Sequence, residues 1–121
     1  MVRLFHITDR EAWEAALRAG EYRLSTRGVT LDEQGFIHCA LAHQLAGVAE
    51  RVYGDGDDDD LVVLVIDGDR LAVPVRYEAP EEGAEPYPHV YGALPTDAVV
   101  DVRPVHRDGD GRLVLPVQGS G

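Results

Sequence analysis

Gly35-Phe36-Ile37-His38-Cys39-Ala40 is a short apolar strand pattern that carries one histidine and runs directly into a helical pattern. Two more histidines stand in similar apolar surroundings: His6 in Val2-Arg3-Leu4-Phe5-His6-Ile7-Thr8, and His89 in Tyr87-Pro88-His89-Val90-Tyr91-Gly92. A histidine inside an apolar strand is either hydrogen-bonded in the core or placed for chemistry. We expect the fold to bring these three rings to one cleft.

A helix is expected directly after this strand, over residues 41–52. Its apolar residues share one helical face, and they are Leu41, Leu45, Val48, Ala49 and Val52. Tyr53-Gly54 ends the pattern. On the other side of the strand, residues 25–34 have mixed polarity and one glycine, so we expect a surface loop there.

The N-terminal segment predicts a strand over residues 2–7 followed by a helix. Thr8 and Glu11 have the spacing of a capping box, which predicts that the helix begins at Thr8. Gly20 is suited to end this helix. The apolar face of the helix comprises Trp13, Ala16 and Leu17.

Strands dominate the remaining chain. Residues 61–66 form a continuous apolar run, which is typical of a central strand buried on both faces. Asp108-Gly109-Asp110-Gly111 is a hairpin signal and predicts a returning strand over 112–117. Further strands are expected at 21–24, 73–78, 89–91 and 99–105, with a proline-rich loop over 79–88. The element order predicts a single α+β domain over 1–121, in which two N-terminal helices pack on a mostly antiparallel sheet.

The acidic run from Asp55 to Asp60 invites comparison with a calcium-binding loop. A calcium loop that begins at Asp55 requires glycine at its sixth position and glutamate at its twelfth. Asp60 and Ile66 occupy those positions. We therefore expect a solvated acidic turn.

The charge balance restricts the partners. The chain has 22 acidic and 11 basic residues, a net charge of -11 at pH 7, and no lysine. Such a surface repels phosphate backbones, so we expect no duplex nucleic acid and no membrane as a partner. Without lysine, Schiff-base and phosphate-loop lysine chemistry is excluded. The single cysteine and the lack of a signal-peptide pattern predict a cytoplasmic protein.

Several side chains are candidates for chemistry. His38 and Cys39 are strand neighbours that point to opposite faces, so they cannot form a nucleophile–base pair, and Cys39 is expected in the core. His89 follows a proline, and Gly92 permits a close approach of backbone or ligand. Glu78 ends a strand before a long loop, where functional carboxylates are often placed.

Three histidines could also bind zinc. The spacings of 32 and 51 residues between His6, His38 and His89 match no metal motif, so no metal is expected. His43 and His106 are expected at the surface.

The motifs together resemble the bacterial domain-of-unknown-function family 952 over about residues 3–105. They are Phe5-His6-Ile7-Thr8, Gly35-Phe36-Ile37-His38 and Pro88-His89-Val90-Tyr91-Gly92. That family has the fold of the ADP-ribosyltransferase superfamily, which includes RNA 2′-phosphotransferases. The resemblance implies an ADP-ribosyltransferase-like α+β fold with a split sheet, and NAD as the ligand.

The resemblance also implies roles for particular residues. In the superfamily, a strand histidine followed two residues later by threonine contacts a ribose of NAD, and His6 and Thr8 match this pattern. Glu78 would face the positive charge that develops on the ribose. The implied catalytic residues are His6, His38, Glu78 and His89. The implied nucleotide-binding residues are His6, Thr8, Tyr22, His38, His89, Tyr91 and Gly92, in which Tyr22 or Tyr91 stacks on a ring and Arg23, Arg27 or Arg76 meets the pyrophosphate.

Three functions stay open at this point. The first is an enzyme that uses NAD as its substrate and cleaves the nicotinamide–ribose bond. The second is a non-catalytic module that binds NAD, ADP-ribose or another small nucleotide. The third is a histidine-based metal-dependent hydrolase or a structural protein.

Overall fold

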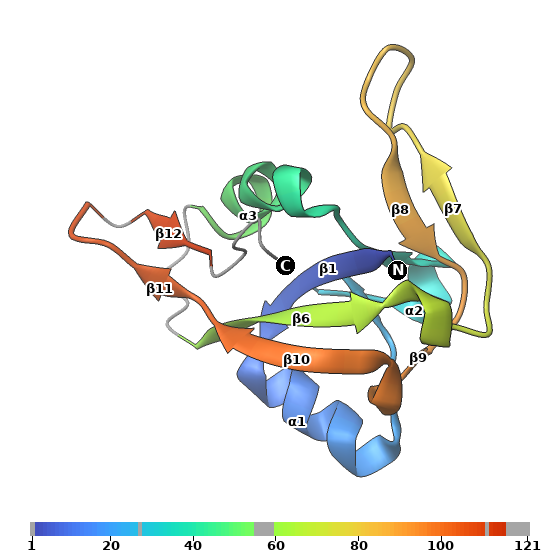
Figure 1. The fold of residues 1–121 in the computed structure, drawn as a ribbon. Helices are drawn as coiled ribbons and strands as arrows, with labels where there is room; N and C mark the ends of the chain where they lie inside the picture. The colour runs from blue at the N-terminus through green and yellow to red at the C-terminus, as the bar shows by residue number, and fades with distance from the viewer. Residues whose placement is uncertain (1, 27, 55–59, 111, 116–121) are drawn as a thin grey trace.

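The computed structural model describes residues 2–26, 28–54, 60–110 and 112–115 (Figure 1). Over this part of the chain, antiparallel strands form two three-stranded sheets and several two-stranded ladders, flanked by helices. The predicted α+β class is confirmed. The acidic run at 55–59 and the predicted end of the last strand at 116–117 lie outside the described residues.

Strand β6 (Leu61–Asp67) is the centre of the first sheet. It pairs antiparallel with β1 (Arg3–Asp9) on one side and with β10 (Val99–Pro104) on the other. Every residue of β6 is buried, which confirms the predicted central strand. The register places His6 opposite Leu64.

Each face of this sheet has its own core, because successive strand side chains point to opposite faces. Helix α1 (Arg10–Ala19) covers one face and helix α3 (Leu45–Tyr53) covers the other (Figure 1). The core beside α1 includes Leu4, Trp13, Tyr22, Ile37, Val62, Leu64, Ile66 and Val90. The core beside α3 includes Phe5, Ile7, Leu45, Ala49, Tyr53, Val63 and Val65.

Helix α1 begins at Arg10, later than predicted, so the prediction of a capping box at Thr8 is wrong. Strand β1 continues through Asp9, which stands at the N-cap without a side-chain hydrogen bond to the helix. Thr8 is only 3% exposed, because it lies within strand β1 and faces the core. Gly20 ends the helix in the left-handed conformation with φ of 89°, as predicted.

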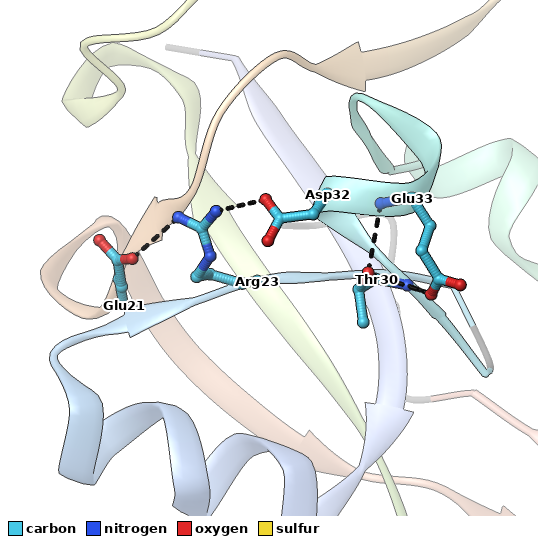
Figure 2. A network of polar contacts seen from close by, with 5 residues as sticks. All are labelled: Glu21, Arg23, Thr30, Asp32 and Glu33. Atoms are coloured by element: carbon cyan, nitrogen blue, oxygen red, sulfur yellow. Dashed lines mark hydrogen bonds and ion pairs between the residues drawn. The ribbon is translucent and has the colours of Figure 1, made fainter.

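The predicted loop over 25–34 is structured, so that prediction is also wrong. Strand β3 (Leu24–Thr26) pairs with β4 (Val29–Thr30), and helix α2 (Leu31–Gln34) follows. A capping box begins α2: the Glu33 N–H donates to Thr30 Oγ1 at 3.2 Å, and the Thr30 N–H donates to Glu33 Oε1 at 3.0 Å (Figure 2). Thr30 and Glu33, three positions apart, were the signal for this helix.

The second sheet has the order β5-β8-β7 and consists of β5 (Ile37–His38), β8 (Tyr87–Val90) and β7 (Val75–Glu78). Strands β7 and β8 and their connection project away from the first sheet (Figure 1). Phe5 and Ala40 exchange two backbone hydrogen bonds of 2.8 Å, which join the end of the β5 segment to β1. Residues 35–40 thus belong to the second sheet through β5 and join it to the first sheet through Ala40.

The predicted helix over 41–52 is divided into a 3-10 turn, η1 (Ala42–Gln44), and α3. Its apolar face packs on β1 and β6 through Leu45 and Ala49, as predicted. The remaining elements are β2 (Glu21–Tyr22) paired with β9 (Leu94–Pro95), η2 (Gly68–Arg70), η3 (Thr96–Ala98), and the hairpin of β11 (His106–Arg107) and β12 (Leu113–Val114). Within the described ranges, no helix has the length and apolar character needed to cross a membrane.

Candidate functional site

The second sheet brings His38 and His89 together. The two residues are register partners between β5 and β8, and Arg76 of β7 pairs with His89 on its other side. Because paired residues of a sheet point to the same face, the rings of His38 and His89 meet edge to face, with centroids 5.1 Å apart. The alternate residues Ile37 and Val90 point into the core.

Glu78 is the carboxylate of this cluster. Its Oε1 accepts a hydrogen bond from His89 Nδ1 at 2.7 Å and another from the Tyr91 hydroxyl at 2.5 Å. The Tyr91 and His89 hydrogen bonds lower the pKa of Glu78, so it is ionised at neutral pH. Since both donors use Oε1, Oε2 is directed to neither of them, and the side chain is 39% exposed.

An aromatic wall surrounds the two histidines. Phe36 stacks on His89 with ring centroids 4.1 Å apart and an interplanar angle of 19°, and it also contacts His38 and Tyr91. The Arg76 guanidinium lies over the Tyr91 ring, 5.2 Å from its centroid. We call Phe36, His38, Glu78, His89 and Tyr91 the histidine–glutamate cluster.

His6 lies apart from this cluster, in the core. Its Nδ1 lies 2.6 Å from the His38 carbonyl oxygen, and its Nε2 lies 2.8 Å from the Tyr22 hydroxyl. A carbonyl only accepts, so Nδ1 carries the proton, and the neutral ring accepts from Tyr22 at Nε2. Burial lowers the pKa of His6 to about 4, which keeps the ring neutral.

The structure therefore corrects the expectation that the three histidine rings meet in one cleft. His6 touches His38 through the backbone, and both of its ring nitrogens are engaged inside the protein. The predicted stacking of Tyr22 on a ligand ring is wrong, because this residue is 1% exposed and its hydroxyl is hydrogen-bonded to His6. The buried pair of Tyr22 and His6 instead supports strand β5 through the hydrogen bond from His6 to the His38 carbonyl.

A cavity of about 610 Å³ adjoins His38. Its walls come from β1, the β5 segment, α3 and the connection between β7 and β8. His6 forms part of one wall although it is only 4% exposed. The residues that line it include His38, Arg51, Glu81, Glu85 and Tyr87. His38 belongs both to this cavity and to the histidine–glutamate cluster, so the two adjoin each other at this residue.

Burial and the neighbouring His89 lower the pKa of His38, in that order of size. The ring is therefore neutral at pH 7 and can both donate and accept a hydrogen bond. Cys39, on the opposite face of β5, is 4% exposed, and burial raises the pKa of its thiol to about 12. Its predicted place in the core is confirmed.

Gly92 has a packing role that differs from the predicted one. A Cβ atom at this position would lie 2.5 Å from Cγ1 of Val73. The glycine therefore makes room for Val73, and the predicted approach of a ligand to this point does not fit. Tyr91, one residue earlier, does belong to the cluster.

Of the three arginines predicted to bind a pyrophosphate, the structure describes two, and these two have different surroundings. Arg23 lies on the surface between Glu21 at 3.0 Å and Asp32 at 2.7 Å, so two carboxylates already engage it (Figure 2). Arg27 is outside the described residues, and Arg76 lies over Tyr91. Arg51, which lines the cavity, was missed, because on the helical pattern it is simply a polar residue of α3.

Among the described residues, no group of three or more His, Cys, Asp or Glu side chains is arranged to hold a metal ion. The hydrolase alternative required His6, His38 and His89 as joint ligands. The ring nitrogens of His6 are bonded to Tyr22 and to the His38 backbone, so this triad is not formed.

The chain is similar to protein CC0527 from Caulobacter crescentus. The crystal structure of that protein superimposes with a TM-score of 0.79 at 25% identity, over 93% of this chain and 94% of that one. Its solution NMR structure gives a TM-score of 0.73 at 27% identity, over 93% of this chain and 91% of that one. No curated protein matches the chain. The family described as "Protein of unknown function (DUF952)" matches residues 7–102, which include the whole histidine–glutamate cluster, and the chain belongs to this family.

Proposed function

We propose that this protein binds NAD in the cavity beside His38 and cleaves its nicotinamide–ribose bond at the histidine–glutamate cluster, as an ADP-ribosyltransferase-like enzyme. The observation that supports this is the arrangement of Glu78, an ionised carboxylate held by His89 and Tyr91. His38 links this carboxylate to a cavity large enough for a nucleotide.

The proposed chemistry needs a fixed negative charge. When the C–N bond to nicotinamide breaks, its electron pair leaves with nicotinamide, and positive charge develops on the ribose. Glu78 would stabilise that charge through Oε2, and the neutral His38 would hydrogen-bond a ribose hydroxyl. Attack by water on the ribose carbon then gives ADP-ribose and one proton, while a hydroxyl acceptor would give an ADP-ribosylated product.

The test is nicotinamide release from NAD by the purified protein and two glutamate variants. Glu78→Gln keeps an oxygen that accepts from His89 and Tyr91 but removes the charge. We expect it to lower the rate by about 100-fold to 1,000-fold while ADP-ribose still binds. Glu14→Gln, on the exposed side of α1, should release nicotinamide at the wild-type rate. Equal rates for wild type and Glu78→Gln would refute the proposed role of the cluster.

Binding without cleavage is the second candidate function. One observation favours it: Glu78, the carboxylate of the cluster, is not among the residues that line the cavity. Stabilisation of the fold by NAD or ADP-ribose, measured as a concentration-dependent rise in Tm, with no nicotinamide released over hours, would select this function.

A further inference from the structure

Arg51 is an exposed cation at the rim of the cavity, where it forms part of the lining. It lies in the last turn of α3, where its Nη2 donates to the Tyr87 hydroxyl at 3.3 Å and its guanidinium lies 5.6 Å from the centroid of the Tyr87 ring. In the described part of the chain no carboxylate forms an ion pair with Arg51, whereas Arg10 and Arg103 each have one and Arg23 has two. The contact with Tyr87 holds the guanidinium, and none of the described carboxylates compensates its charge.

The surroundings of Arg51 leave space beside its charge. A Cβ atom at Gly47, one helical turn earlier, would lie 3.6 Å from Arg51 Nη1, and no other atom would lie within 4 Å of it. Gly47 and Arg51 are both exposed, so a dissolved anion can reach this side of the guanidinium.

Most of the other ionisable side chains of the cavity lining are either paired with another residue or neutral. Glu85 is bound by His43, whose Nε2 lies 2.5 Å from Glu85 Oε2. His38 is neutral at pH 7 because burial lowers its pKa. Glu81 is the remaining carboxylate of the lining, and it forms no ion pair with Arg51 or with any other cation in the described ranges. Among the described lining residues, the charged side chains are thus one cation, Arg51, and two carboxylates, of which Glu85 is engaged by His43 and Glu81 forms no ion pair.

We propose that Arg51, oriented by Tyr87, binds the diphosphate group of the ligand in this cavity. A guanidinium presents several donors in a planar fork that matches phosphate oxygens, and an aromatic ring beneath it restricts its orientation. The identification of the diphosphate as part of a nucleotide rests on the proposed function, but the anion site itself does not. The site selects nucleotides that carry a diphosphate over nucleosides that carry none.

Isothermal titration with inorganic pyrophosphate, ADP-ribose and adenosine tests this site. We expect pyrophosphate and ADP-ribose to bind, and Arg51→Gln to weaken both by about tenfold to hundredfold. Adenosine affinity should be the same in wild type and Arg51→Gln. Arg18→Gln, at an exposed position of α1, removes the same charge away from the cavity and should leave all three affinities unchanged.

A variant that removes a negative charge from the cavity lining distinguishes a specific anion site from a general effect of net charge. Glu81→Gln removes the opposing charge and should tighten pyrophosphate binding, whereas Glu14→Gln should not. Pyrophosphate binding that depends on Arg51 supports the proposal even when no nicotinamide is released, so failure of the proposed function is a separate result. Absence of pyrophosphate binding, or equal affinities in wild type and Arg51→Gln, overturns the anion site even when NAD is cleaved.

Discussion

His6 is held by two hydrogen bonds inside the core, and this geometry gives it a structural role. Its strand position and its neighbour Thr8 match a nucleotide-binding pattern, yet the ring donates to the His38 backbone and accepts from Tyr22. The motif therefore located a residue that positions the site, while Glu78, held by the buried His89, provides the exposed carboxylate. Sequence alone could not separate these cases, because both types of histidine lie in apolar strands.

Protonation of His6 should make stability depend on pH. Burial lowers its pKa from 6.5 to about 4 in the folded protein. Between these values the unfolded chain binds a proton that the folded chain does not, so stability falls as the pH drops through this window and levels off below about pH 4. We expect His6 to account for a loss of about 2 kcal/mol between pH 7 and pH 5.

Urea unfolding at pH 7 and pH 5 measures this loss. In His6→Gln the difference between the two pH values should be smaller than in wild type by that amount. His106→Gln, at an exposed position of β11, serves as the matched control and should retain the wild-type difference. An unchanged pH dependence in His6→Gln would show that other groups produce it.

At the scale of elements, the connection between β7 and β8 is attached to the turn before α3. Gln44 of η1 donates to the Pro86 carbonyl at 2.8 Å and accepts from the Leu41 N–H at 2.9 Å. His43 is exposed, as predicted, and pairs with Glu85 of the connection. These contacts hold one wall of the cavity, and they could not be derived from the helical pattern, in which Gln44 is only a polar position.

Gln44→Ala should loosen this attachment. Gln44 is 5% exposed, so its removal leaves the Leu41 N–H and the Pro86 carbonyl without this partner, and we expect a destabilisation of about 1–3 kcal/mol. Amide hydrogen exchange should also become faster at Leu41. Gln34→Ala, at the exposed end of α2, is the matched control and should have little effect. Wild-type exchange at Leu41 in Gln44→Ala would contradict the attachment.

At the scale of the whole molecule, β6 separates two cores and supports both. Leu64 and Ile66 face α1, and Val63 and Val65 face α3. The sequence predicted this strand correctly because a continuous apolar run fits a strand covered on both faces. The prediction for the apolar face of helix α1 was wrong at one position. Leu17 was expected on the buried apolar face, but it is 55% exposed.

Leu64 and Leu17 form a matched pair of sites for measuring how much burial in the core contributes to the free energy of unfolding. Leu64 is fully buried at 0% exposure, so Leu64→Ala leaves a cavity between β6 and α1 and should cost about 2–5 kcal/mol of unfolding free energy. Leu17→Ala removes the same atoms from an exposed position and should change it by less than about 0.5 kcal/mol. Chemical denaturation of both variants gives the comparison, and similar losses in the two would contradict the described core.

The sequence by itself determined the local patterns: the apolar strand at 61–66, the helix stop at Gly20, the hairpin after β11 and the helical face of α3. These follow from periodicity and turn chemistry, which depend on neighbouring residues. Only the tertiary structure decided that His38, His89 and Glu78 meet, that His6 is enclosed, and that Arg51 faces the cavity. Those relations depend on the register between strands distant in the chain, and a shift of one residue would turn each side chain to the other face.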